Sequence, residues 1–171
     1  MEQDLLRAML VFASSGLDSM VKHLIRDTLA AVIDRDEGAL EMLKENVKRN
    51  LYRDRNLDAE LLVNALVAKD PKALLIDGLV YELTTSSLQS SEQVFRVASF
   101  FNIPTNQLTA DPRDLGQVFK VRNEIAHEMD IDFSQPNRKR RPRSKDAMIA
   151  NTNTLFAVCR AFLERVDEKL Q

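Results

Sequence analysis

Three side chains that can bind an anion and move a proton lie within six residues, in the stretch VRNEIAHEMD (residues 121–130). Arg122 carries a permanent, forked cation that suits phosphate and the extra charge of a pentavalent phosphorus transition state. Histidine changes charge near neutral pH, so His127 can take a proton from a hydroxyl group and return one to a leaving group. Asn123 can orient both by hydrogen bonding. These residue types suit metal-free RNA cleavage, in which the substrate's 2′-hydroxyl group is the nucleophile.

The spacing of the three residues determines how they meet on a helix. At about 100° per residue, Asn123 and His127 are four apart and share one face. Arg122 and His127 are five apart, so their directions differ by about 140° and the long arginine must swing round to reach the same anion. A structural explanation is also open, because the helix dipole favours Arg and His near a C-terminus by about 0.3–1 kcal/mol each.

The motif has one histidine, whereas the reaction needs both a base and an acid. A two-fold homodimer that joins two copies of this helix would supply the second histidine and double the positive charge. The other histidine of the chain, His23, lies in a long apolar pattern, where a packed or surface residue is expected. Glu124 and His127 have the spacing of half a di-metal site, but the other ligands are missing, so we expect no metal and no cofactor.

Basic residues gather next to this motif. Residues 120–145 hold eight basic and four acidic side chains, so this segment is +4 in a chain whose net charge is −2. Basic side chains bind an RNA backbone through salt-dependent, sequence-independent contacts. A solvated loop that aids solubility and a localisation signal are the alternatives. The residues expected to bind RNA are Lys120, Arg138, Lys139, Arg140, Arg141 and Arg143.

The elements that must position the motif are helices. Glycine and proline are scarce, with 4 and 5 residues, and apolar residues recur at helical spacing along the chain. We expect Ile149, Phe156 and Leu163 on the apolar face of the last helix. The sequence therefore predicts one all-α domain over residues 1–171, a compact bundle of about six helices with a basic loop at 131–144. The predicted helices cover residues 3–34, 37–53, a short segment from an Asp58 cap to Asp70-Pro71, 72–87, 91–101 after a Ser90 cap, a segment from Asp111-Pro112 to the motif, and 145–170 after a Ser144 cap.

Composition excludes several classes of protein. The chain has a single cysteine, Cys159, in an apolar stretch, which excludes a disulfide framework and favours a buried thiol. There is no glycine-rich phosphate loop for a nucleotide. No apolar run reaches the ~18–20 residues of a membrane span, and the first residues do not have the pattern of a signal peptide. We therefore expect a soluble, cytoplasmic protein.

The stretch RNEIAHE, with the order Arg122, Asn123, three residues, His127, resembles the motif of the HEPN superfamily, and the following HEMD resembles its RiboL-PSP variant. The long first and last helices and the motif near the end of a helix are similar as well, so the resemblance covers most of the chain. It implies a helical fold, a homodimer with facing motifs and a metal-independent endoribonuclease, often a toxin or an anti-phage effector. It also implies that Arg122 and His127 are essential and that Asn123 supports them.

Two functions therefore stay open. The first is an endoribonuclease with RNA as its substrate, held in check by an antitoxin or a regulatory protein that the chain itself does not reveal. The alternative is a non-catalytic helical module of the same superfamily that binds RNA, a nucleotide or a protein partner. A purely structural helical domain is a third reading.

Overall fold

The computed structural model describes residues 2–53 and 63–171, and these form an all-α fold with a long helix at each end, as predicted. The predicted Asp58 cap lies outside the described residues. Residues 63–67 are helical, and the connector before the motif helix contains one extra helical turn, α6. The named helices are α1 (Glu2–Arg35), α2 (Glu37–Arg53), α4 (Pro71–Thr85), α5 (Ser91–Phe100), α6 (Thr105–Leu108), α7 (Pro112–Glu128) and α8 (Lys145–Leu170).

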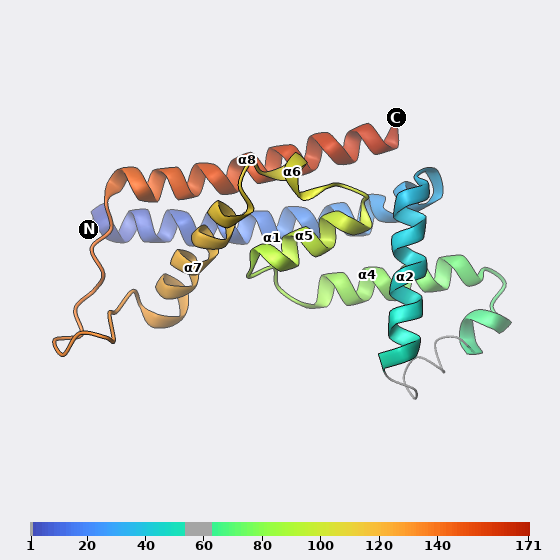
Figure 1. Cartoon of the computed structure of the whole chain (residues 1–171), viewed down its shortest axis with the longest axis horizontal. Helices are drawn as coiled ribbons and strands as arrows, with labels where there is room; N and C mark the ends of the chain where they lie inside the picture. The colour runs from blue at the N-terminus through green and yellow to red at the C-terminus, as the bar shows by residue number, and fades with distance from the viewer. Residues whose placement is uncertain (1, 54–62) are drawn as a thin grey trace.

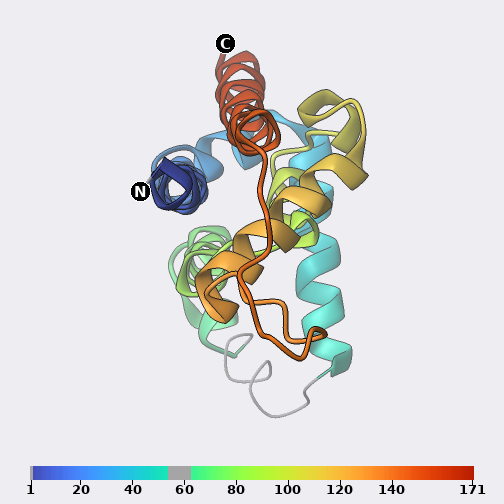
Figure 2. The ribbon, with the colours of Figure 1, turned by 90° about the vertical axis from the view of Figure 1, so that its left-hand side faces the viewer.

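The helices α1 and α8 lie side by side and run in the same direction along the whole molecule (Figure 1). Lys145 forms an ion pair with Glu2 at one end, and Arg35 donates a hydrogen bond to the carbonyl oxygen of Leu170 at the other. Figure 2 shows both helices end-on, with the remaining helices on one side of the pair. The two helices thus form a long frame against which the shorter helices pack.

The buried stripe of α8 is narrower than its apolar sequence pattern. Met148, Leu155 and Phe162 are fully buried, and the ring of Phe162 meets that of Phe101 edge to face at 5.6 Å between centroids. The expectation for Ile149, Phe156 and Leu163 was wrong, because these residues are 37%, 56% and 42% exposed. They follow one another at intervals of seven residues, so they form one line along the flank of α8, outside its buried stripe.

Capping residues set where several helices begin. Ser144 accepts a hydrogen bond from Ala147 N, and Ser90 accepts one from Gln93 N, as predicted. Asp70-Pro71 begins α4, because the Asp70 carboxylate accepts from Ala73 N and proline is accommodated in the first helical turn. The dipeptide thus starts the next helix as well as closing the preceding segment.

A carboxylate between α1 and α2 joins several helix ends at the C-terminal end of α1 and α8. The Asp36 carboxylate, between α1 and α2, accepts from Ala39 N at 2.9 Å, Asn102 Nδ2 at 2.9 Å and Lys169 Nζ at 2.6 Å. Burial raises the pKa of Asp36, but these three donors outweigh burial and leave the pKa below its usual value. The carboxylate joins the end of α1 to α2, to the segment after α5 and to the end of α8.

The motif helix α7 packs against α1, α5 and α8. It begins at the predicted cap, where the Asp111 carboxylate accepts from Arg113 N and Pro112 follows. Leu115, Val118 and Phe119 are buried on its inner face. No helix in the described part of the chain is both long and apolar enough to span a membrane.

Candidate active site

The structure brings Arg122, Asn123 and His127 together at the C-terminal end of α7. Arg122 Nη1 donates to Asn123 Oδ1 at 3.0 Å and lies 3.4 Å from His127 Nε2. The arginine has therefore swung round the helix, across the angle that separates positions five apart. The contact with His127 is a hydrogen bond in the tautomer whose Nε2 carries no proton.

The amide of Asn123 is fixed from the opposite side by a segment that the sequence did not point to. Asn123 Nδ2 donates to the carbonyl oxygen of Gln89 at 3.3 Å. The backbone around Gln89 is held in turn, because Leu88 N donates to Asp18 Oδ1 of α1 at 2.7 Å and Gln89 N donates to Gln93 Oε1 at 2.6 Å. A chain of hydrogen bonds thus runs from α1 to Asn123 and on to Arg122.

The charge of Arg122 is not neutralised within the described residues. Its side chain is half-buried, no described carboxylate lies within 4 Å of it, and its buried Nε has no hydrogen-bond partner among them. His127 is exposed at the surface. Most buried polar groups in proteins are hydrogen-bonded, so this half-buried guanidinium is suited to an anion that approaches His127 from solvent.

The acidic side chains next to His127 are held by arginines of the basic segment. Glu124 Oε2 accepts from Arg143 Nη2 at 2.5 Å, and Glu128 Oε2 accepts from Arg141 Nη1 at 3.2 Å. Each carboxylate is therefore paired with a cation. These pairs reduce the repulsion that two free carboxylates would exert on a phosphate group near His127.

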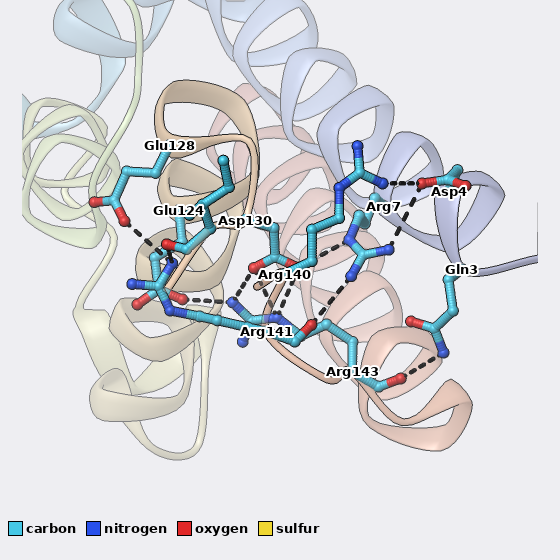
Figure 3. Close-up of polar contacts among 10 residues, drawn as sticks. Gln3, Asp4, Arg7, Glu124, Glu128, Asp130, Arg140, Arg141 and Arg143 are labelled. Carbon is cyan, nitrogen blue, oxygen red and sulfur yellow. Dashed lines mark hydrogen bonds and ion pairs between the residues drawn. The ribbon is translucent and has the colours of Figure 1, made fainter. Parts of the chain in front are cut away.

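The carboxylate of Asp130, three residues after His127, is the most enclosed charge near the motif. It is 0% exposed and accepts from Arg7 Nε of α1 at 2.8 Å and from Arg143 Nη2 at 2.6 Å (Figure 3). Burial raises the pKa of Asp130, but the hydrogen bonds from Arg143 and Arg7 outweigh it and hold the pKa below its usual value. Asp130 therefore stays ionised and binds α1, the end of α7 and the start of α8 to one another.

The predicted basic loop is a folded hairpin. Ile131 and Arg140 form an antiparallel bridge, Asp132 N donates to the carbonyl oxygen of Lys139 at 2.9 Å, and Arg141 N donates to that of Asp130 at 2.7 Å. Arg138 has a left-handed backbone conformation in the turn, with a φ of 46°. The hairpin thus carries Arg138 and Lys139 near its tip.

The six residues predicted to bind RNA divide into two groups. Arg140 is paired with Asp4, and Arg141 and Arg143 hold the acidic residues described above. The other three are exposed, and no described carboxylate lies within 4 Å of them: Lys120, Arg138 and Lys139. The paired arginines thus have a structural role that the sequence pattern did not indicate.

A cavity of about 390 Å³ opens beside Asn123, between α7 and the start of α5. Its walls include Gln89, Glu92, Phe119, Lys120 and Asn123. The exposed Lys120 lies one helical turn before Asn123, so the cavity joins the motif to one of the free cations.

The remaining candidate residues lie outside this arrangement. His23 is exposed on α1. Cys159 is half-buried on α8, and burial raises the pKa of its thiol. Within residues 2–53 and 63–171, no group of three or more His, Cys, Asp and Glu side chains is arranged to hold a metal ion.

A scan against protein-family models and searches of curated proteins and of solved structures found no match to this chain.

The buried charge of Asp130 predicts a pH-dependent stability. The pKa of Asp130 is lowered in the folded state, so its contribution is present above the unfolded pKa of about 3.9 and is lost as the pH falls through the folded value. Removal of one partner of a buried ion pair costs about 3–5 kcal/mol, so Asp130→Asn should lower the free energy of unfolding by that amount at pH 7. Urea unfolding followed by circular dichroism measures it.

The difference between wild type and Asp130→Asn should shrink as the pH falls below about 4, because the unfolded wild-type chain binds a proton there while the folded carboxylate stays ionised until the pH reaches its lowered pKa. Asp4→Asn is the matched control, because Asp4 also contacts Arg7 but is 56% exposed; its effect should be much smaller. A difference for Asp130→Asn that stays constant from pH 7 to pH 3 would contradict this account of the carboxylate.

Proposed function

We propose that this chain is a metal-independent endoribonuclease of the HEPN type, which uses the 2′-hydroxyl group of its RNA substrate as the nucleophile. The observation that carries the proposal is the exposed His127 ring at 3.4 Å from Arg122, whose charge no described carboxylate neutralises. This pair combines a group that can move a proton with a cation that can bind the same phosphate.

In the proposed reaction His127 takes the proton of the 2′-hydroxyl group, and the 2′-oxygen forms a bond to the adjacent phosphorus. Arg122 stabilises the negative charge that develops on the non-bridging oxygens, and Asn123 keeps the guanidinium in place. The bond from phosphorus to the 5′-oxygen then breaks, and this oxygen leaves with a proton. The products are a 2′,3′-cyclic phosphate and a 5′-hydroxyl end.

The proton for the leaving 5′-oxygen comes from the second copy of the motif in a homodimer, as the HEPN resemblance suggests. Each chain brings one histidine to its motif, so two facing copies supply a base and an acid. We also propose that the protein acts in the cytoplasm as a toxin or an anti-phage effector, under the control of an antitoxin or another regulatory protein. The size of the complex in solution tests the homodimer.

The free cations near the motif hold the RNA backbone in this proposal. Lys120, Arg138 and Lys139 are the ones available to phosphate, whereas Arg141 and Arg143 hold the acidic residues beside the motif. The alternative, a non-catalytic module that binds RNA, a nucleotide or a protein, is favoured by the single acid–base group of each motif. Cleavage and binding measured for His127→Ala separate the ribonuclease from the non-catalytic module.

Replacement of Lys120, Arg138 and Lys139 by glutamine should weaken RNA binding and reduce its dependence on salt. Each lost phosphate contact lowers the slope of log K against log salt by about 0.7 for a single strand. Fluorescence anisotropy with a labelled RNA at several salt concentrations gives this slope. The matched control replaces Arg26, Arg49 and Arg160, three exposed cations on α1, α2 and α8. Equal slopes for the two triple variants would contradict the assignment.

The central test is cleavage of total RNA and tRNA by the purified protein in EDTA, with product ends mapped. Wild type should give 2′,3′-cyclic phosphate and 5′-hydroxyl ends. His127→Ala should lose about 10²–10⁴-fold in rate because the proton-transfer group is removed, and Arg122→Ala should lose a similar factor because the charge on phosphorus is no longer stabilised.

The control is His23→Ala, which removes the other histidine of the chain and should cut like wild type. RNA affinity of His127→Ala should stay within a few fold of wild type. If His127→Ala and Arg122→Ala cut as fast as wild type, the assignment of the site is wrong. If wild type binds RNA but leaves it intact, the non-catalytic module is the better account.

A further inference from the structure

We propose that Asp130 and Arg143 are positioning residues, which hold the last turn of α7 so that His127 faces Arg122. The catalytic consequence of this inference rests on the proposed ribonuclease function, but its structural part does not. Neither residue touches the reacting groups in the proposed reaction. Both act through the backbone and side chains of the turn that carries His127.

The end of α7 has a backbone that needs outside support. Met129 and Asp130 follow the helix with φ values of 53° and 59°, a left-handed backbone conformation that residues other than glycine rarely adopt. Asp130 N donates to the carbonyl oxygen of Glu124 at 2.8 Å, which closes the helix end over the turn that contains His127. The Asp130 carboxylate, bound to Arg7 and Arg143, locks this conformation in place.

Arg143 contacts residues on both sides of the same turn. Its Nη2 donates to Asp130 Oδ1 at 2.6 Å and to Glu124 Oε2 at 2.5 Å. Glu124 precedes His127 by three residues and Asp130 follows it by three, so one guanidinium bridges both sides of the histidine. Loss of this bridge frees the helix end at the position of the imidazole.

The contact between Arg122 and His127 is too weak to hold its own geometry. Its length of 3.4 Å is at the long limit for a hydrogen bond, and the histidine is exposed. The hydrogen bonds of Asp130 from Arg7 Nε and Arg143 Nη2 are shorter, at 2.8 and 2.6 Å, and each joins a cation to a carboxylate that is 0% exposed, whereas the contact of Arg122 with His127 has no anionic partner. The relative position of Arg122 and His127 is therefore set by the enclosed network rather than by the pair itself.

Asp36 offers a matched control in the same chain. Its side chain is 17% exposed, and it also joins helix ends through a lysine, an asparagine amide and a backbone N–H. It binds the end of α8, whereas Asp130 lies before the start of that helix, so it is remote from His127 (Figure 1). Asp36→Asn should lower stability without a change at the motif.

The experiment compares Asp130→Asn, Arg143→Lys and Asp36→Asn, with the fraction of folded protein measured for each. The chain has 2 histidines, so the imidazole signals of His127 in a two-dimensional NMR spectrum are assigned with His127→Ala. Asp130→Asn should shift and broaden these signals and leave those of His23 unchanged. Arg143→Lys keeps a cation but not the fork that bridges Asp130 and Glu124, so it should give a smaller change in the same direction.

The kinetic readout is the kcat and KM for RNA per folded molecule. A misplacement of about 1 Å costs on the order of 10²-fold in rate, so kcat should fall by up to that factor in Asp130→Asn while KM stays within a few fold. Asp36→Asn should keep both constants and the His127 signals. If Asp130→Asn does not fold, Glu124→Gln replaces it, since Glu124 is 17% exposed and its loss removes one arm of the bridge.

Unchanged His127 signals in folded Asp130→Asn, or in folded Glu124→Gln where it serves as the substitute, would overturn the proposal. An equal change in Asp36→Asn would do the same. If wild type does not cleave RNA, the ribonuclease proposal fails and the NMR comparison still decides the positioning role. The two proposals can therefore fail separately.

Discussion

The buried carboxylate of Asp130 is the interaction on which the arrangement of the motif depends. An isolated buried charge is costly, so it persists where cations and hydrogen bonds surround it. Arg7 and Arg143 meet this requirement from opposite sides, and both are themselves mostly buried. The carboxylate therefore binds α1, which is far away in the sequence, to the end of α7 and to the segment before α8, and it does so three residues after His127. The geometry of the motif is tied to the integrity of this ion-pair network.

The long helix α1 supports the motif at two points. Near its N-terminus Arg7 binds Asp130, behind the end of α7, and further along Asp18 holds the segment before α5 through Leu88 N. That segment presents the carbonyl oxygen of Gln89 to Asn123. The motif helix lies between these supports, so Arg122 and His127 are oriented by a rigid scaffold, as a positioned proton-transfer group requires.

The sequence predicts the local features of the fold well because their causes are local. The caps at Ser90, Asp111 and Ser144 and the long terminal helices follow from residue types within a few positions. The pairing of Arg7 with Asp130 joins residues 123 positions apart, and no short pattern announces it. The paired arginines of the hairpin look like free cations in the sequence for the same reason. The exposed Phe156 of α8 shows that apolar type alone does not define a buried face.

The central claim is that Arg122 and His127 act on an RNA phosphate through the neighbouring 2′-hydroxyl group. The most direct measurement uses one RNA oligonucleotide that the protein cuts, compared with the same oligonucleotide carrying a single 2′-O-methyl group at the cleavage position. The account predicts that the methyl group abolishes the cut, because it removes the proton that His127 takes and blocks the nucleophile. Cleavage of the methylated RNA at the same bond would contradict it.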